Sequence, residues 1–303
     1  MGTGMDVLLT EAGRQGWTYE RGRLLSTLTS FKIGGPAELL LTARTEPELT
    51  AMLAACHWAE VPFFIVGNGS NLLVPDEGLR GAVILLDAGL WGLALCDDGL
   101  TVECGAGVRL SGLANFALKH GLTGLEFAHG IPGTAGGAAY MNAGAYGGEM
   151  ANVLTTVRHL DAEGQPVTLP ADRLNLGYRT SVYKTNGGVI TRITVRLRPG
   201  NPAEIGAKMR DLMARRRDKQ PLDYPSAGSV FKRPPGYFAG TLIETCGLKG
   251  RAVGGAMVSE KHAGFIVNAG GATCADVKAL IALIRAEVLK QTGVELECEI
   301  KLL

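Results

Sequence analysis

The sequence predicts an α+β fold built from short, mixed helices and strands. Helical patterns over 45–59, 109–121 and 274–292 stand among short apolar or alternating segments typical of strands. Their order lacks the regular strand–helix alternation of a doubly wound sheet. Many of the 43 glycines fall in short clusters between apolar runs. Clustered glycines indicate loops in which the backbone approaches a ligand closely.

The length and the charge of the chain limit what it can be. With 303 residues it is long enough for two domains, or for three small ones. The formal net charge of +1 argues against a nucleic-acid partner, which would favour a strong basic excess. We expect a domain boundary near residue 200, where Asn201 can cap a helix that has Pro202 at its first position.

The six cysteines form no CxxC pair, and no histidine stands at zinc-ligand spacing from them. We therefore expect small buried hydrophobic residues and no metal site. Scattered free thiols fit a reducing cytosol, so we expect a cytoplasmic protein. The N-terminus has no basic-then-apolar signal pattern, and no apolar run reaches about 18 residues, so we expect no membrane partner.

The expected elements follow from local patterns. In the helix over 45–59, Thr45 and Glu48 have the spacing of a capping box. The helix over 109–121 ends at Gly121, and "VRHLDAEGQPVTLP" (157–170) predicts a hairpin that turns near Gly164.

Alternation predicts two half-buried strands. Segment 188–200 places Ile193, Val195 and Leu197 on one face. At the C-terminus, Leu296, Cys298, Ile300 and Leu302 are expected to face inward. Between these strands, the helix over 274–292 carries an apolar stripe and ends at Gly293.

Three glycine loops indicate a ligand: "VGNGSNLLV" (66–74), "CGAGV" (104–108) and "GIPGTAGGAAYMNAGAYGGEM" (130–150). Consecutive backbone N–H groups in such loops form concavities that suit a phosphate or a diphosphate. Ser70, Asn71, Thr134 and Asn142 add neutral hydrogen-bond donors. No Walker A pattern, no GxGxxG (position 72 is leucine) and no GxSxG occurs here. One such loop could be a tight turn, but the three together favour a diphosphate-containing ligand.

Six segments in order resemble one family, UDP-N-acetylenolpyruvoylglucosamine reductase: "VGNGSNLLV", "GLEFAHGIPGTAGGAAYMNAGAYGGEM", "LGYRTSVYK", "AGSVFKRP", "LIETCGLKG" and "LECEIKLL". The resemblance implies an FAD-binding fold of the vanillyl-alcohol-oxidase (PCMH) type in two subdomains, 1–86 and 87–200. A C-terminal α+β substrate-binding domain then covers 201–303. One strand and one helix separate Arg179 from Ser229, which resembles the short form of the family that lacks the tyrosine-loop insertion.

The implied reaction reduces UDP-N-acetylglucosamine enolpyruvate to UDP-N-acetylmuramate in peptidoglycan precursor synthesis, with non-covalent FAD and with NADPH as reductant. Reduced flavin delivers hydride to the vinyl carbon. By resemblance Ser229 then gives the proton, Arg179 holds the developing enolate carboxylate and Glu299 hydrogen-bonds the aci-carboxylate. Residue types alone leave alternatives: Ser229 fits a turn, Arg179 fits an exposed strand edge, and Glu295 and Glu297 are equivalent to Glu299.

The resemblance also implies two sets of binding residues. The flavin set comprises Gly67, Asn68, Gly69, Ser70, Asn71, Gly133, Thr134, Gly136, Gly137, Asn142, Gly144, Ala145, Tyr146 and Gly147. The substrate set comprises Tyr178, Lys232, Arg233 and His262, with the basic pair expected on the UDP diphosphate. An exposed basic pair and a core histidine remain open as structural alternatives. We expect a monomer or a weak homo-oligomer.

Two other functions remain open at this stage. One is an oxidase of a sugar or alcohol on the same flavin fold, since such oxidases often tether flavin through a histidine or cysteine, and His129 precedes Gly130. The other is a non-catalytic protein that binds nucleotide sugars. The presence of Ser229, Arg179 and Glu299 together favours the reductase.

Overall fold

The computed structural model describes residues 3–87 and 92–303, and its contacts group the chain into two compact units. Unit 1 comprises Met1–Arg21, Leu39–Asn68 and Arg80–Arg215, and unit 2 comprises Gly22–Glu38, Gly69–Leu79 and Arg216–Leu303. Each unit has its own cluster of buried apolar side chains. Helix α5 (Pro202–Lys219) carries the chain from one unit to the other.

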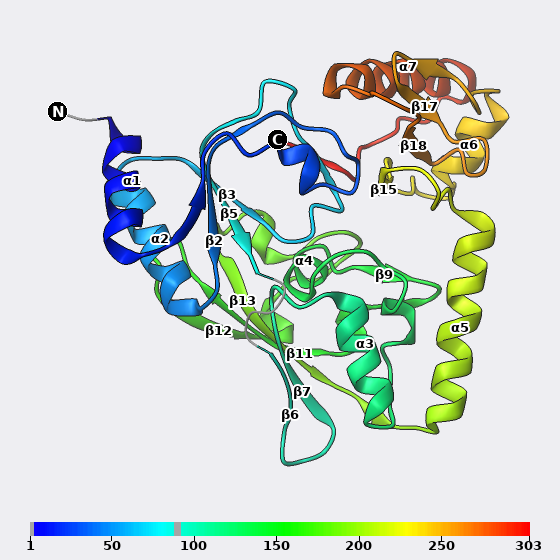
Figure 1. Cartoon of the computed structure of the whole chain (residues 1–303). Helices are drawn as coiled ribbons and strands as arrows, with labels where there is room; N and C mark the ends of the chain where they lie inside the picture. Colours follow the sequence, from blue (N-terminus) through cyan, green and yellow to red (C-terminus); the bar gives the residue numbers. More distant parts are fainter. Residues whose placement is uncertain (1–2, 88–91) are drawn as a thin grey trace. The chain divides into compact units, whose positions relative to one another are not determined.

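Unit 1 contains a mixed four-stranded sheet covered by two helices. The strand order is β1 (Thr18–Glu20), β2 (Ala37–Ala43), β5 (Leu79–Leu86) and β3 (Phe63–Val66), with β3 parallel to β5 and β1 antiparallel to β2. Helices α1 (Gly4–Gln15) and α2 (Glu46–Trp58) lie together beside this sheet (Figure 1). Leu39 and Leu41 of β2 are fully buried with Leu49 of α2, so apolar burial joins sheet and helix.

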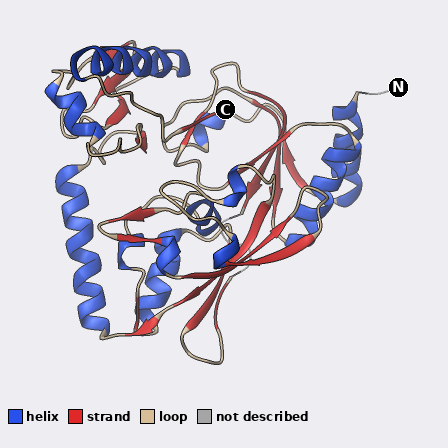
Figure 2. Cartoon of the chain, turned by 180° about the vertical axis from the view of Figure 1, so that it is seen from behind, coloured by secondary structure: helices blue, strands red, loops and turns tan. Residues whose placement is uncertain are grey.

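Unit 1 also contains a second sheet, which has five antiparallel strands (Figure 2). Its order is β12 (Pro166–Pro170), β11 (Leu154–Leu160), β13 (Val189–Arg196), β7 (Thr101–Gly105) and β6 (Leu93–Leu95). Val157, Ile193 and Val102 are fully buried on one face, whereas Arg158 and Arg192 lie on the other, as the two-residue period of a strand requires.

Smaller elements hold the loops of unit 1. They are α3 (Leu110–Lys119), α4 (Ala135–Tyr140), the pair β8 (Leu122–Thr123) with β14 (Arg198–Pro199), and the pair β9 (Gly144–Ala145) with β10 (Gly148–Glu149). Single 3₁₀ turns occupy Leu25–Thr27 (in unit 2), Glu126–Ala128, Met150–Asn152, Ala171–Arg173 and Val182–Lys184.

Unit 2 is an antiparallel sheet with two helices. The order is β15 (Ser226–Ser229), β18 (Phe265–Asn268), β17 (Ala256–Val258) and β16 (Ala252–Val253), and the helices are α6 (Ala239–Thr245) and α7 (Cys274–Thr292). A short parallel pair joins β4 (Leu72–Leu73) to β19 (Lys301–Leu302). The apolar stripe of α7, including Val277, Leu280 and Ile284, is buried in the same cluster as Val258 of β17.

Most of the predicted elements are confirmed, because local signals set their ends. Helix α7 covers the predicted residues, with Thr273 capping its first turn and Gly293 ending it at φ +72°. At α2 the Thr45 side chain accepts from the Glu48 N–H, but the Glu48 carboxylate accepts from the N–H of Arg44 instead of completing the capping box. The hairpin of β11 and β12 matches the predicted segment 157–170.

The prediction of one continuous C-terminal strand is wrong. Only Lys301–Leu302 forms a strand, although Leu296 and Ile300 are buried as expected; Leu302 is 44% exposed. The reason is a change of partner: Lys232 N–H donates to the carbonyl of Glu297, whereas Lys301 N–H donates to the carbonyl of Asn71. A segment that switches neighbours within four residues cannot keep one regular ladder.

Other expectations have mixed outcomes. Helix α5 begins at Pro202 as expected, and the Asn201 side chain accepts from the Ala203 N–H. The boundary between the two units, however, falls between Arg215 and Arg216, inside this helix. The three consecutive domains stay a prediction.

All six cysteines are free thiols, of which Cys56, Cys104 and Cys274 are buried and the others partly exposed. Among the residues described here, no helix has the length and apolar character needed to cross a membrane.

Candidate functional site

The glycine loops of unit 1 converge on the segment that precedes α4. The N–H groups of Ala135 and Gly136 donate to the carbonyls of Val108 and Ala106 in the second loop, at 2.8 and 2.9 Å. Gly67 of the first loop approaches Thr134 so closely that a Cβ at residue 67 would lie 2.6 Å from the threonine Oγ1. The structure therefore brings together loops that the sequence separates by up to about 70 residues, as expected of one ligand site.

Local contacts explain why glycine and threonine occur where the loops meet before α4. A Cβ at Gly136 would lie 2.7 Å from the Cβ of Ala106, so only glycine lets α4 pack here. The Thr134 side chain caps α4 by accepting from the N–H of Gly137 at 3.3 Å, and the carbonyl of Gly133 accepts from Leu110. The loop thus has a single, tightly determined conformation.

The end of the third loop is a two-residue hairpin. Ala145 of β9 pairs with Gly148 of β10, and the connecting residues Tyr146 and Gly147 have φ of +53° and +84°. Two positive φ angles in a two-residue connection are those of a type I′ turn. The Tyr146 side chain is 46% exposed, so it is available to a ligand.

The asparagines expected to bind the cofactor have partners within the protein. Asn142 in unit 1 is completely buried and bonds to the backbone of Gly177 and Ala151. In unit 2, the Asn71 side chain donates to the Glu299 carbonyl at 3.3 Å. Of the same loop, Gly67 and Asn68 belong to unit 1, whereas Gly69 and Ser70 belong with Asn71 to unit 2.

Arg179 lies in a tight turn in unit 1. Gly177 and Thr180 exchange backbone hydrogen bonds of 3.2 Å across it, which leaves Tyr178 and Arg179 at its tip. Arg179 has φ of +56°, a conformation that non-glycine residues rarely adopt. Its guanidinium donates to the carbonyl of Gly144 at 3.2 Å and lies 5.2 Å from the ring centre of Tyr178. Residues held in such sparsely populated conformations cluster at functional sites.

Ser229 and Glu299 lie on adjacent segments of unit 2. Ser229 ends β15 opposite Phe265 of β18, and the next residue, Val230, donates to the carbonyl of Gly264 at 2.9 Å. On the other side, the Glu299 N–H donates to the carbonyl of Val230 at 2.7 Å. Val230 and Glu299, 69 positions apart in the sequence, are thereby joined by a backbone hydrogen bond.

The structure separates the three C-terminal glutamates. Glu295 pairs with Arg285 at 3.0 Å and Glu297 pairs with Lys232, and both glutamate side chains are about three-quarters exposed (75% and 73%). Glu299 is only partly exposed. Partial burial next to Ser229 distinguishes Glu299 from the two solvated ion pairs, which residue type alone did not.

The predicted substrate residues of unit 2 have defined neighbours. Arg233 stacks over the exposed ring of Phe238, with its Cζ 4.0 Å from the ring centre. His262 Nδ1 accepts from the N–H of Gly264 at 3.1 Å, which places the proton of the neutral ring on Nε2. Burial lowers the pKa of His262, so the imidazole is neutral near pH 7.

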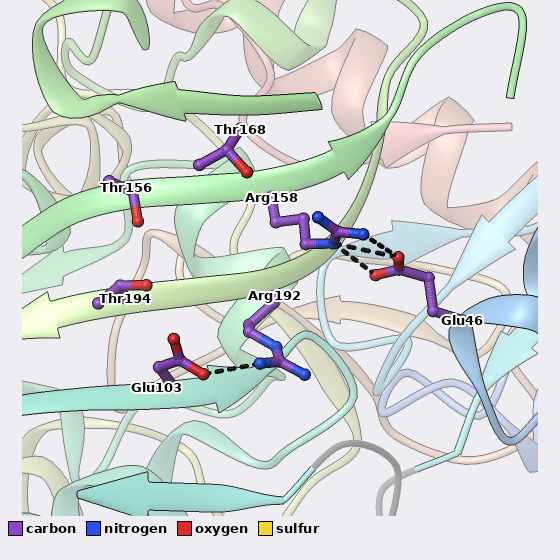
Figure 3. Close-up of a pocket in the computed structure, with 7 residues that line it drawn as sticks. All are labelled: Glu46, Glu103, Thr156, Arg158, Thr168, Arg192 and Thr194. Atoms are coloured by element: carbon purple, nitrogen blue, oxygen red, sulfur yellow. Dashed lines mark hydrogen bonds and ion pairs between the residues drawn. The ribbon is translucent and has the colours of Figure 1, made fainter. Parts of the chain in front are cut away.

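A cavity of about 400 Å³ lies on the polar face of the five-stranded sheet of unit 1, and none of the predicted site residues lines it (Figure 3). Its lining is Glu46, Glu103, Thr156, Arg158, Thr168, Arg192 and Thr194. Arg158 forms a two-pronged ion pair with Glu46, and Arg192 pairs with Glu103 at 2.6 Å. The two guanidinium and two carboxylate groups offer no net charge to a ligand. This is a solvated sheet face on which Arg192 pairs with Glu103 across two strands and Arg158 pairs with Glu46 of helix α2.

Family models match most of the chain. Residues 37–170 match the FAD binding domain, and residues 220–303 match the UDP-N-acetylenolpyruvoylglucosamine reductase C-terminal domain. The chain is 50% identical over 274 residues to the UDP-N-acetylenolpyruvoylglucosamine reductase of Caldanaerobacter subterraneus subsp. tengcongensis, covering 90% of each. It is 46% identical over 273 residues to that of Clostridium perfringens (strain 13), covering 90% of this chain and 89% of the relative.

The chain belongs to the UDP-N-acetylenolpyruvoylglucosamine reductase family. A crystal structure of that reductase from Thermus caldophilus is similar with a TM-score of 0.81 and 38% identity, over 94% of this chain and 99% of the other. The fold is therefore the flavin-binding fold expected from the sequence, followed by the C-terminal domain of this reductase family.

The residues of unit 1 fit the flavin dinucleotide of this reductase family. Glycine at positions 67 and 136 lets the backbones of the three loops converge against the side chains of Thr134 and Ala106. In addition, His129 Nδ1 is buried and has no hydrogen-bond partner among the described residues. Buried polar atoms are normally satisfied, so an orphaned nitrogen next to the third glycine loop fits a group that the protein itself does not supply.

Sequence reasoning missed the residues that hold the Arg179 turn in this reductase. The Ser181 hydroxyl donates to the carbonyl of Tyr140 at 2.7 Å, and the Tyr183 hydroxyl meets His159 Nδ1 at 3.2 Å. Both Ser181 and Tyr183 lie in "GYRTSVYK", a segment in which only Tyr178 and Arg179 were predicted as site residues. Their partners lie far away in the sequence, so no local pattern reveals these contacts.

Proposed function

We infer that this chain reduces UDP-N-acetylglucosamine enolpyruvate to UDP-N-acetylmuramate with FAD and NADPH, as the names of its relatives imply for their own reaction. The observation that supports the site most directly is the hydrogen bond from Glu299 N–H to the Val230 carbonyl. It joins Glu299 to the residue that follows Ser229, within one unit. The match of residues 220–303 to this reductase favours it over an oxidase on the same flavin fold.

Three residues carry the proposed chemistry. FAD, when bound, supplies the hydride that NADPH provides. Charge then develops on the carbon next to the substrate carboxylate, and a guanidinium suits that planar carboxylate, so we assign it to Arg179. Glu299 hydrogen-bonds the same carboxylate, and Ser229 gives its proton to the carbanion-like carbon. A serine is a weak acid, but the carbon is a strong base, so position matters more than acidity.

The remaining substrate residues bind the nucleotide part. We propose that Lys232 and Arg233 face the diphosphate, that His262 donates from Nε2, and that Tyr178 orients the substrate. Two observations support this. Lys232 lies three residues after Ser229, and His262 lies two residues before Gly264, whose carbonyl accepts from Val230. His262 Nδ1 already accepts from Gly264, which leaves Nε2 as the donor. A cytoplasmic location, a monomer or weak homo-oligomer, and membership of the short form are proposed with the function.

Anaerobic stopped-flow spectroscopy tests this function in two halves. NADPH should bleach the yellow flavin of the purified protein, and enolpyruvyl-UDP-N-acetylglucosamine should restore its colour. For Ser229→Ala, we expect normal bleaching and a return of colour slowed by about 10²–10⁴-fold, the usual contribution of a general acid. Ser226→Ala, at the other end of β15, is the matched control.

The outcomes are distinct. A protein that takes up no FAD, or a reduced flavin that the enolpyruvyl substrate does not reoxidise, would contradict the reductase function. Equal losses in both half-reactions of Ser229→Ala would instead mean that Ser229 shapes the site without donating the proton. Reoxidation of reduced flavin by oxygen alone, with no response to the enolpyruvyl substrate, would support the oxidase.

A further inference from the structure

Asn142 is unusual among the residues that the sequence assigned to the cofactor. Its side chain has no exposed surface, and its backbone has φ of +42°. The side-chain Nδ2 donates to the carbonyl of Gly177 at 3.0 Å, and Oδ1 accepts from the N–H of Ala151 at 2.9 Å. A group that contacts a bound cofactor must be reachable when the cofactor is absent, and this amide is not.

The partner of Asn142 is the first residue of the Arg179 turn. Gly177 exchanges backbone hydrogen bonds with Thr180, so the carbonyl held by Asn142 belongs to the base of the turn that carries Arg179. Arg179 is at φ +56°, a conformation that a free chain would leave readily. Contacts from the surrounding structure must therefore maintain it.

Two further contacts join this turn to the third glycine loop. The Arg179 guanidinium donates to Gly144, and Ser181 donates to Tyr140. Asn142 stands between Tyr140 and Gly144 in the sequence and supplies the central contact from a fully buried position. The same loop that binds flavin by family resemblance thus holds the arginine turn in place.

We propose that Asn142 is a positioning residue for Arg179, acting through Gly177, and not a hydrogen-bond donor to the cofactor. The proposal rests on the role of Arg179 given under the proposed function. Loss of the Asn142 amide leaves the Gly177 carbonyl without this partner and lets the turn shift. A shift of about 1 Å in a group that orients substrate can cost about 10²-fold in rate.

Asn142→Gly tests the proposal, because glycine accepts φ +42° without strain and removes only the side chain. The matched control is Asn175→Gly: Asn175 also has positive φ (+48°) and lies two residues before Gly177, but its side chain is exposed. For Asn142→Gly, we expect a roughly 10–10²-fold slower reoxidation of flavin by the enolpyruvyl substrate. FAD affinity, measured by fluorescence titration, and the rate of bleaching by NADPH should stay near wild type, and Asn175→Gly should change none of these.

A double-mutant cycle with Arg179→Met gives a readout that a general structural role would not move. If Asn142 acts through Arg179, Asn142→Gly should add little to the loss already caused by Arg179→Met. If the rate losses of the two single variants multiplied in the double variant, the positioning role would be wrong. Weakened FAD binding as the main effect of Asn142→Gly would also overturn it. An Arg179→Met variant with an unchanged reoxidation rate would show instead that the proposed role of Arg179 fails, and this inference with it.

A second variant covers the case in which Asn142→Gly fails to fold. Asn142→Ala truncates the side chain at Cβ and removes both the donor to Gly177 and the acceptor for Ala151 without burying a charge. It should show the same selective slowing of reoxidation by substrate. Unchanged reoxidation in Asn142→Ala would overturn the proposal.

Discussion

The Glu299 N–H donates to the carbonyl of Val230 at 2.7 Å, which joins the C-terminal segment to the residue that follows Ser229. The Glu299 carbonyl in turn accepts from Asn71, so the backbone of Glu299 is held on both sides. This double attachment gives the glutamate a defined position, although it stands outside any regular strand. In unit 2 the segment around Val230 and the C-terminal segment are therefore joined by a few backbone hydrogen bonds outside any regular strand.

Replacement of Glu299 should slow the reaction, whereas replacement of another glutamate of the C-terminal segment should not. We expect Glu299→Ala to slow flavin reoxidation by the enolpyruvyl substrate by about 10²-fold or more, because alanine offers no group to hydrogen-bond the substrate carboxylate. Glu295→Ala should have little effect, since Glu295 forms only an exposed pair with Arg285. Single-turnover kinetics of the two variants provide the comparison, and equal rates would contradict the assignment of Glu299.

Gly67→Ala should damage the flavin site by sterics alone. The new methyl would lie 2.6 Å from Thr134 Oγ1, far inside contact distance, so the first and third loops must move apart. We expect weaker FAD binding and a free energy of unfolding lower by about 1–3 kcal/mol. Gly13→Ala is the control, because nothing lies within 4 Å of a Cβ there and alanine favours the helix. Urea unfolding and FAD titration measure these effects. Equal stability and equal FAD affinity in Gly67→Ala and Gly13→Ala would contradict the steric argument.

Arg179→Gly should remove activity and relieve strain at the same time. The positive φ of Arg179 costs about 1 kcal/mol or more for an L-residue, whereas glycine adopts it freely. Because glycine also gains entropy in the unfolded chain, we expect a net change in the free energy of unfolding between zero and about +1 kcal/mol. Arg179→Lys keeps the strain and should not be stabilised. A clear destabilisation of Arg179→Gly, measured by thermal unfolding, would argue against strain at this turn.

The ion pair between Glu46 and Arg158 predicts a pH dependence of stability. Hydrogen bonding from Arg158 lowers the pKa of Glu46 below its ordinary value of 4.5. A lowered folded-state pKa stabilises the protein above pH 4.5, and this contribution is lost as pH falls through the folded-state pKa. We therefore expect Glu46→Gln to lower the free energy of unfolding by about 1 kcal/mol or less at pH 7.

The difference between wild type and Glu46→Gln should shrink as the pH is lowered below 4.5. Glu103→Gln is a suitable comparison, since its pair with Arg192 is more exposed, at 42% for each side chain, and should contribute less. Urea unfolding of the three proteins at several pH values measures these effects. If the difference in the free energy of unfolding between wild type and Glu46→Gln grew at lower pH, the prediction for this ion pair would be wrong.

The sequence by itself determined the elements whose signals are local. Thr273 and Gly293 set the ends of α7, and the alternating residues of β13 set its buried face, since capping and periodicity act within a few residues. The glycine loops, and the family motifs that contain Ser229, Arg179 and Glu299, are likewise local strings. They were sufficient to predict the fold and the reaction.

Only the tertiary structure decided what the polar side chains contact. Asn71 and Asn142 were both expected to serve the cofactor, but Asn71 donates to the Glu299 carbonyl and Asn142 to that of Gly177. The alternating C-terminal segment is likewise not one strand, because its hydrogen bonds pass from Val230 to Asn71 within three residues. A side-chain amide or a backbone N–H accepts any suitably placed partner. Which partner it meets depends on segments that are distant in the sequence and are brought near only by packing.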